Sequence, residues 1–366
     1  MSESIFVGFV GLGLAVTLHV IFTAMTLGTG LIAAITRYSA YKNNDPWAEM
    51  LARKVFKVLI VSELFSGVWG TIITVFLAGF FTAITTLATN TLFVPISIAI
   101  ASIMIRIPTI AISWYTWGKI SPRTHSIIMF IMALSGFGVP FGFRAIFAEI
   151  NYPYAVAYYL QSGQNPGWLA YENPLFWTLY LHTVAAVIST GGFVVASLMA
   201  LENDAKAVRR GLWFGFGFLT AQLALGPLYW YSLRLYSPLL FRAVNHEYAP
   251  LFAIKLAAVA ALLVLGYSAL RQAKEGEVAS YAKWLGPLAL FTVALGEILN
   301  DGTRYPNLVL MGKQGLSVNL FANFYIDIPM PAVDVILAFL VLSIVVFTTA
   351  AYYALYKRFL AEVPTE

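Results

Sequence analysis

Two histidines lie inside long apolar segments of this chain. His19 occurs in LGLAVTLHVIFTAMTLGTGLIAAI and His182 in FWTLYLHTVAAVISTGGFVVASLMA. A neutral imidazole in such surroundings can ligate haem iron; the alternative is a histidine that packs between helices and hydrogen-bonds to a neighbour. Polar groups inside a membrane are costly and usually have a function, so the presence of two histidines favours cofactor ligation.

The segments that carry these histidines indicate an integral membrane protein. Of 366 residues, 60% are hydrophobic and 11% are charged, whereas a soluble domain has about 25% charged residues. We expect one all-α membrane domain over residues 1–366, without a cleavable signal peptide because MSESIFVGF lacks a basic start. The absence of cysteine excludes thiolate-bound haem, c-type attachment and iron–sulfur clusters.

Nine membrane spans follow from the apolar runs and the breakers between them. Basic residues gather in alternate loops, as with Lys206, Arg209 and Arg210 after the fifth span, so the net charge of +5 reflects topology and not nucleic-acid binding. The positive-inside rule predicts an outer N-terminus and a cytoplasmic C-terminus in a multi-pass protein of the plasma membrane, surrounded by lipid. The predicted spans are 6–36, 57–86, 93–117, 125–147, 174–200, 211–233, 249–270, 284–300 and 330–356.

This orientation brings ionisable side chains together toward the outer face of the membrane. His182, Lys255, Asp301 and Arg304 converge there, and His19 is within reach if the first span is long and tilted. The two histidines are candidate axial ligands, Asp301 is a possible carboxylate ligand, and Arg304 and Lys255 are candidates to neutralise haem propionates. The alternative for Asp301 is a helix-end residue paired with Arg304.

The number of histidines excludes two kinds of haem protein. The chain has only His19, His125, His182 and His246. A haem–copper oxidase needs more histidines for its haems and copper, so we expect no copper; a cytochrome b of the bc type needs paired histidines repeated along its helices, which are not present. His125 in KISPRTHS is predicted to have a helix-start or loop role.

Four strings resemble subunit I of the cytochrome bd quinol oxidases. LHVIFTAMTLGTGLIAAI resembles the first helix of that family, LHTVAA resembles its fifth-helix motif HTVAS, and WGKISPRTH resembles the loop before its fourth helix. GEILNDGTRYPN aligns without gaps on the pattern G-W-x-x-x-E-x-G-R-x-P-W, with Gly296, Arg304 and Pro306 kept and Asp301 in place of the glutamate. The strings occur in the family's order.

The resemblance implies a respiratory subunit with two or three haems, of type b and with haem d possible. His19 would be an axial ligand of a high-spin haem, Asp301 would ligate or face the other haem of the active pair, and His182 would ligate the low-spin haem that takes electrons from quinol. Oxygen would be reduced at the haem pair, and quinol would be oxidised on the outer side. A second membrane subunit would be the partner.

Several positions depart from the family pattern. Ala257 falls where the family has the methionine opposite His182, so His246 or Met330 would have to replace that ligand, or the iron would have one axial ligand. Lys255 stands for the neighbouring arginine. Glu297 replaces a tryptophan and, beside Asp301, is a candidate catalytic proton donor, with pairing to Arg304 or Lys255 as the alternative.

The proton and quinol routes of the family are also altered. Ile98 and Arg106 stand where two glutamates are expected, and we expect Arg106 to pair with Glu63. The hydrophilic quinol loop after the sixth span is missing. We therefore keep two alternatives to a quinol oxidase: a non-oxidase haem-b electron-transfer or anchor subunit of the same fold, and a transporter without haem.

Overall fold

The structure, a computed structural model, describes residues 3–304 and 330–352, and all its regular elements are helices. Eight of these helices are long and apolar enough to cross a membrane, and α13 carries a shorter apolar stretch, Asp334–Val346. The predicted all-α membrane fold is therefore confirmed for the described residues. The long helices are α1 Glu3–Asn43, α2 Pro46–Phe80, α4 Phe93–Tyr115, α5 Pro122–Asn151, α7 Phe176–Leu201, α8 Ala205–Tyr236, α10 Ala249–Lys274, α11 Leu285–Gly302 and α13 Met330–Tyr352.

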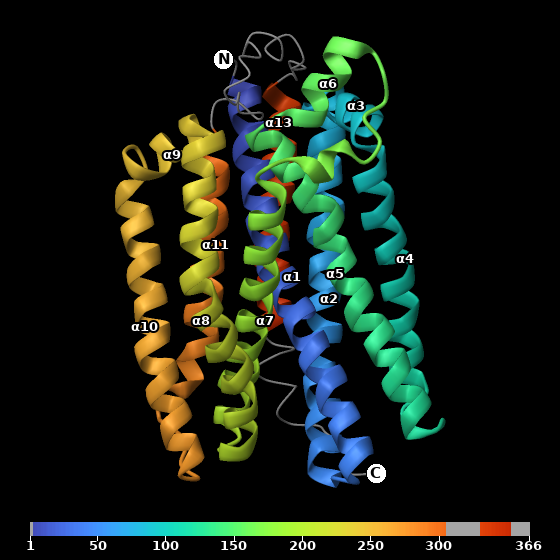
Figure 1. Cartoon of the computed structure of the whole chain (residues 1–366), viewed down its shortest axis with the longest axis vertical. Coiled ribbons are helices and arrows are strands. Elements are labelled where there is room, and N and C mark those ends of the chain that lie inside the picture. The colour runs from blue at the N-terminus through green and yellow to red at the C-terminus, as the bar shows by residue number, and fades with distance from the viewer. Residues whose placement is uncertain (1–2, 305–329, 353–366) are drawn as a thin grey trace.

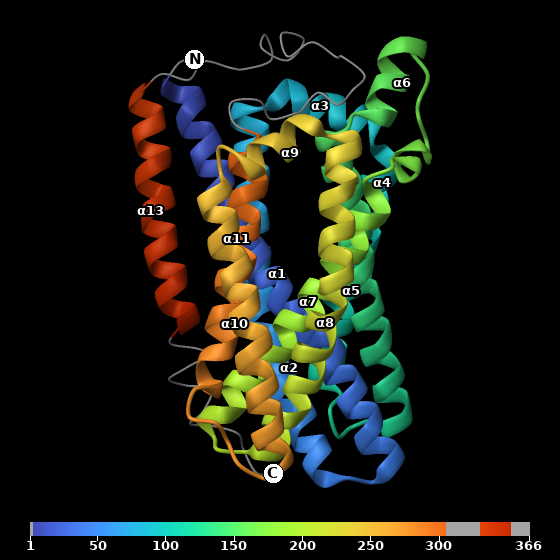
Figure 2. The ribbon, with the colours of Figure 1, turned by 60° about the vertical axis from the view of Figure 1, so that its left-hand side comes forward.

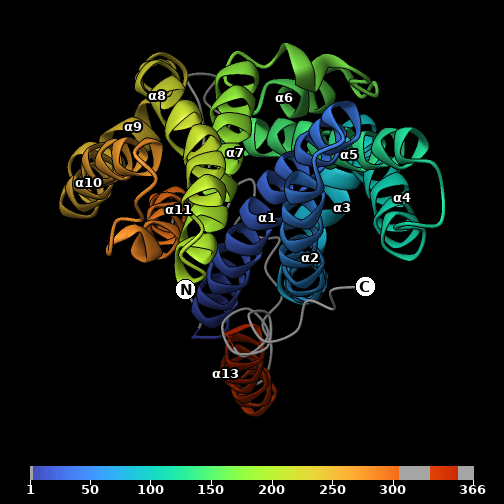
Figure 3. The ribbon, with the colours of Figure 1, turned by 90° about the horizontal axis from the view of Figure 1, so that it is seen from below.

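The long helices run side by side along one axis (Figure 1). Three short helices gather at one end of the bundle, which we call the α9 end (Figure 2). Seen along the axis, α1 and α7 lie in the middle of the bundle, with α10 and α4 at opposite edges and α13 outside α1 (Figure 3). The short helices are α3 Thr82–Thr91, α6 Tyr154–Ser162 and α9 Pro238–Asn245, with 3₁₀ turns η1 Leu169–Glu172 and η2 Ala282–Trp284.

The second long helix shows where the predicted span limits were wrong. The prediction was 57–86, but α2 begins at Pro46 and ends at Phe80. The carboxylate of Asp45 caps the helix by accepting hydrogen bonds from the backbone N–H groups of Trp47 and Ala48, at 3.0 and 3.3 Å. A good cap followed by proline starts a helix before the apolar run begins, so α2 extends beyond its membrane-spanning part.

The two helices that carry the candidate histidines cross at a pair of glycines. A Cβ added at Gly28 of α1 would lie 2.2 Å from the carbonyl oxygen of Val187 and 2.8 Å from the Cα of Gly191, both on α7. Small residues let membrane helices approach this closely. The crossing thus sets the spacing between the α1 segment with His19 and the α7 segment with His182.

The expected Arg106–Glu63 pair is confirmed inside the bundle. Arg106 Nη2 lies 3.0 Å from Glu63 Oε2, and the guanidinium also donates to the hydroxyl of Thr26 at 2.9 Å and to the carbonyl oxygen of Met132 at 3.1 Å. Gly136 makes room for it, because a Cβ there would lie 2.4 Å from Arg106 Nη1. The pair therefore joins α1, α2, α4 and α5.

Candidate functional site

His19 of α1 is oriented by α2. Its Nδ1 lies 2.9 Å from the backbone oxygen of Ser66, and because a carbonyl only accepts, Nδ1 carries the proton. The lone pair then belongs to Nε2, which lies 3.3 Å from the hydroxyl of Thr23. A histidine that ligates a metal commonly donates its other ring N–H to a carbonyl in this way. Gly70 lets α2 approach, since a Cβ there would lie 3.2 Å from the His19 ring.

His182 of α7 is a half-buried imidazole whose ring makes no hydrogen bond within the described part of the chain. Its Nδ1 is fully enclosed and has no partner. The ring of Tyr229 on α8 stacks on it at 5.9 Å between centroids. Gln222 of α8 donates to the backbone oxygen of His182 at 2.7 Å and so ties α8 to this turn of α7.

The end of α11 carries the predicted carboxylate and arginine. Arg304 is buried and its Nη1 lies 3.4 Å from Asp301 Oδ1, while its Nη2 donates to the side-chain oxygen of Asn300 at 2.7 Å. Asp301 Oδ2 is enclosed and has no hydrogen-bond partner among the described residues. This oxygen faces α1, because a Cβ on Gly13 would lie 3.9 Å from it.

A chain of contacts joins the α11 end to His182. Arg304 Nε donates to Asn151 Oδ1 at 3.0 Å, and Asn151 Nδ2 donates to the hydroxyl of Tyr229 at 3.4 Å. Tyr229 is the residue that stacks on His182. Asp301, Arg304 and His182 thus belong to one buried polar site at the α9 end of the bundle, as the sequence predicted.

Lys255 of α10 and Glu297 of α11 complete the same site. A Cβ at Gly296 would lie 3.0 Å from Lys255 Nζ, so the ammonium group rests against α11 one residue from Glu297. Glu297 is buried and its Oε1 accepts a hydrogen bond from Asn300 at 3.3 Å. Within the described residues it forms no ion pair with Arg304 or Lys255 by direct contact, although its charge acts on both.

One face of α5 belongs to the site and was missed at the sequence level. Arg144, Phe147 and Asn151 are spaced i, i+3 and i+7, which places them on one side of a helix. The guanidinium of Arg144 lies 4.9 Å from the centroid of the Phe147 ring, and that of Arg304 lies 5.3 Å from it. The sequence did contain a signal for this face, namely Arg144 itself, because an arginine two turns before the end of an apolar span is unusual.

The residues that would replace the family's methionine as the ligand opposite His182 lie outside this site. His246 is exposed at the end of α9, and Ala257 is exposed on α10. Met330 is the first residue of α13, and its side chain is outside the described part of the structure. That His246 or Met330 replaces the methionine ligand of the family stays a prediction. The last three residues of the GEILNDGTRYPN string, 305–307, also lie outside the described residues.

His125 lies far from this site, in the first turn of α5. Its Nε2 donates to the backbone oxygen of Ser113 at 2.9 Å, and its Nδ1 accepts from Arg37 Nε at 3.1 Å. Both ring nitrogens are therefore satisfied by protein groups. The predicted helix-start role agrees with this position.

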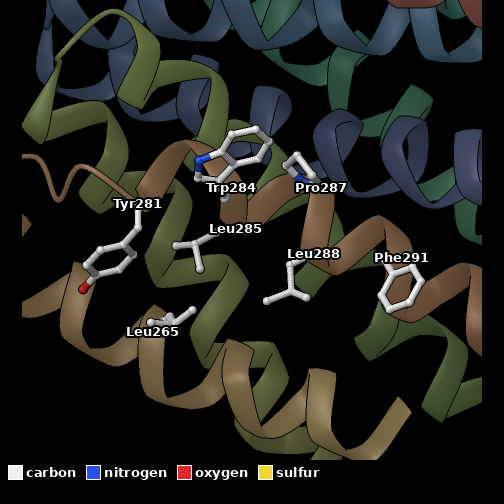
Figure 4. A pocket seen from close by; sticks show the side chains of 7 residues that line it. All are labelled: Leu265, Tyr281, Trp284, Leu285, Pro287, Leu288 and Phe291. Atoms are coloured by element: carbon white, nitrogen blue, oxygen red, sulfur yellow. The ribbon is translucent and has the colours of Figure 1, made fainter. Parts of the chain in front are cut away.

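The described residues also form a shallow pocket of about 360 Å³ between α10 and α11, away from the polar site (Figure 4). Its wall is made of apolar and aromatic side chains, including Leu265, Trp284, Leu288 and Phe291. It lies at the beginning of α11, whereas Asp301 is at the end of that helix. None of the candidate residues His19, His182, Asp301 and Arg304 lines it, so the pocket is separate from the candidate site.

The residues at the α9 end fit a haem. A haem requires axial ligands, cations for its propionates and apolar surroundings. His19 presents its Nε2 lone pair beside the hydroxyl of Thr23, and the enclosed His182 Nδ1 and Asp301 Oδ2 have no protein partner among the described residues. Buried polar atoms are normally hydrogen-bonded, and unpaired ones require an explanation such as a bound group. Arg304 and Lys255 supply positive charge beside them.

The fold and this site define a polytopic α-helical membrane protein with a polar centre buried at one end. The chain belongs to the cytochrome bd terminal oxidase subunit I family, whose sequence profile matches residues 10–250. It is therefore a subunit of a respiratory oxidase class whose cofactors are haems. Residues 251–366, which include Lys255, Asp301 and Arg304, lie outside that match.

Structural comparison extends the likeness along the chain. The fold is similar to the bd oxidase from Geobacillus thermodenitrificans, with a TM-score of 0.84 and 17% sequence identity, covering 99% of each chain. At this identity the match establishes the fold. The search of curated protein sequences gave no match.

Proposed function

We propose that this chain is a haem-binding subunit of a bd-type quinol oxidase, which moves electrons from quinol to oxygen. The observation that carries the proposal is the set of unsatisfied ligand atoms at the α9 end: the enclosed Nδ1 of His182 and Oδ2 of Asp301, beside the oriented ring of His19. The bound haem irons would supply the electron transfer and the oxygen chemistry.

Each ligand would be held by a different neighbouring residue. Ser66 fixes the ring of His19 through its carbonyl group, so that Nε2 points its lone pair away from α2. Tyr229 stacks on His182 and limits the rotation of its ring. Asp301 would present Oδ2, because Oδ1 is held by Arg304. Preorganised ligands of this kind bind a cofactor without first losing side-chain freedom.

The two carboxylates of α11 have separate roles in this proposal. Asp301 ligates or faces a haem, and Glu297, one helical turn away, relays protons to the site. Arg304 and Lys255 bind propionates and lower the electrostatic cost of adding anionic groups to a membrane. The chain would bind two or three haems of type b, and one of them could be a haem d instead.

The chain would sit in the plasma membrane with its α9 end toward the outer side. The end opposite the α9 end carries basic loop residues and half-buried ion pairs such as Lys54–Glu202, which agrees with the positive-inside rule. Quinol would be oxidised near the α9 end. A second membrane subunit would cover part of the apolar surface, where side chains such as Met104 are 70% exposed.

A second function is favoured by the Arg106 network: a haem-b electron-transfer or anchor subunit that does not reduce oxygen. The guanidinium of Arg106 fills the interior between α1, α2, α4 and α5, where it is paired with Glu63 and hydrogen-bonded. This position of α4 therefore has no carboxyl group that could carry protons. Ala257 also offers no ligand to iron. The Arg106 network weakens the proton supply for oxygen reduction, and Ala257 weakens electron entry from quinol at the His182 haem.

The reduced-minus-oxidised absorption spectrum of the purified full chain tests the haem. Bands of b-type haem together with quinol-dependent oxygen consumption are expected for the oxidase. Haem bands without oxygen consumption, in a preparation that contains all co-purifying subunits, would establish the second function instead. A preparation without any haem band would rule out both and leave the haem-free transporter.

The His182→Ala variant tests the ligand assignment. It should lose one haem per chain and remain folded, as measured by pyridine haemochrome assay and by circular dichroism. His125→Ala is the matched control, because it removes another buried imidazole at the opposite end of the bundle. Equal haem content in the two variants would contradict the role of His182.

A further inference from the structure

Arg144 is a charged side chain inside a membrane-spanning helix, and among the described residues it has no ion-pair or hydrogen-bonding partner. It lies on α5, two helical turns before the end of that helix at Asn151. Its guanidinium is stacked over the ring of Phe147 at 4.9 Å. Among residues 3–304 and 330–352, no side chain or backbone carbonyl accepts a hydrogen bond from it and no carboxylate pairs with it.

The neighbouring Arg106 shows what this protein does with an arginine that only stabilises the bundle. That guanidinium is surrounded by acceptors, with Glu63, Thr26 and the backbone of Met132 all within 3.2 Å. An arginine at the centre of a membrane helix costs about 2.5–3.5 kcal/mol on insertion scales. An arginine without protein acceptors, such as Arg144, therefore calls for an anion that is not part of the described chain.

The charges around Arg144 leave an excess of positive charge that an anion would balance. Arg304 flanks the same Phe147 ring from α11 at 5.3 Å, and Lys255 reaches the site from α10. Among the described residues, Asp301 and Glu297 are the carboxylates that act on Arg304 in this site. Three cations thus meet two carboxylates, and Arg144 interacts electrostatically with His182 and Asp301, the candidate ligands.

We propose that Arg144 is a further cofactor-binding residue, which holds a propionate carboxylate of a haem bound at the polar site beside His182 and Asp301. The inference rests on the proposed haem binding and assigns a role to an arginine that the family motifs do not include. A planar guanidinium binds a carboxylate through two parallel N–H···O bonds. Phe147 contacts the guanidinium groups of both Arg144 and Arg304, so the two cations lie on one aromatic ring of the site.

A binding experiment with two forms of the cofactor tests this. The full chain, produced without haem in detergent, is titrated with haemin and with haemin dimethyl ester, in which both propionates are esterified. Arg144→Gln should weaken haemin binding by about tenfold to hundredfold, because a hydrogen bond to a charged group is lost. Binding of the dimethyl ester should stay as in the unmodified chain. Arg123→Gln, at an exposed position of the same helix, is the control and should change neither.

A second readout separates this role from a structural one. Without haem, Arg144→Gln should be at least as heat-stable as the unmodified chain, because it removes an unpaired membrane charge. With haem, the midpoint potential should become more negative, because a positive charge near the iron favours the reduced form. Arg144→Lys keeps the charge and should retain the potential while losing part of the preference for haemin over its ester.

The results that overturn the proposal are distinct from those that overturn the proposed function. If the unmodified chain binds neither form of haemin, both fail. If it binds haemin and Arg144→Gln binds haemin and its ester as before, with an unchanged potential, only the role of Arg144 fails. Equal weakening of haemin and ester binding would likewise reject the propionate contact.

Discussion

The crossing of α1 and α7 at Gly28 gives a prediction whose magnitude follows from the structure. In Gly28→Ala the new methyl carbon would lie 2.2 Å from the carbonyl oxygen of Val187. A carbon and a carbonyl oxygen in contact are normally about 3.3–3.6 Å apart, so α1 and α7 must separate by about 1 Å. The contact atom belongs to the backbone of a buried helix, so no side-chain rotation can relieve the clash.

The cost of this clash can be isolated with a matched glycine. Gly217 of α8 has no neighbouring heavy atom within 4 Å of an added Cβ. Both substitutions gain about 1 kcal/mol from helix propensity, so the difference between them reports the crowding alone. Overpacking a tight interior costs about 1–3 kcal/mol. Gly28→Ala should therefore be less stable than Gly217→Ala by that amount.

Unfolding of the purified chain in mixed micelles, with increasing denaturing detergent, would measure the difference. Thermal unfolding gives a second value, since 1 kcal/mol shifts Tm by about 2–4 °C in domains of 150–250 residues and by less in a longer chain. Gly28→Ala should also broaden the absorption bands of any bound haem, because the spacing of His19 and His182 depends on this crossing. A Gly28→Ala chain as stable as Gly217→Ala would refute the close contact.

Three further predictions concern polar groups. Arg106→Leu should lower stability by about 3–5 kcal/mol because it leaves Glu63 unpaired in the membrane, and the double variant with Glu63→Leu should recover much of the loss; equal losses would contradict the pair. Asp204→Ala should cost about 1 kcal/mol, because Asp204 caps α8, and an unchanged Tm would contradict this. Burial raises the pKa of Tyr171, in the loop before α7, to about 12. The raised pKa means that folded Tyr171 keeps its proton where the unfolded chain loses it, so stability should fall from about pH 10 to 12, and Tyr171→Phe should reduce that fall when unfolding is followed against pH.

Much of the fold was determined by the sequence. A long apolar run in lipid must satisfy its own backbone hydrogen bonds, so it forms a helix, and the order of the runs fixes the order of the helices. The span limits were less certain. At Pro46, capping by Asp45 starts α2 well before the apolar run that marked it, because capping acts on the backbone and not on hydropathy.

The candidate residues were also largely present in the sequence. His19, His182 and Asp301 stood out because ionisable groups are rare in membrane spans, and Arg304 marked the end of the eighth span. Their gathering at one end followed from alternating helix direction. Glu63 was correctly paired with Arg106 by depth and opposite charge.

Only the tertiary structure decided which side chains meet. Membrane helices are apolar on nearly all sides, so the pattern of hydrophobic residues does not reveal which face points inward. The contacts Ser66–His19, Tyr229–His182 and Asn151–Arg304 depend on how helices cross, and that depends on small residues at the crossings such as Gly28. The sequence therefore determined which ionisable side chains the helices carry and toward which helix ends they lie. Packing determined which ligand atoms the protein itself satisfies and which it leaves unpaired.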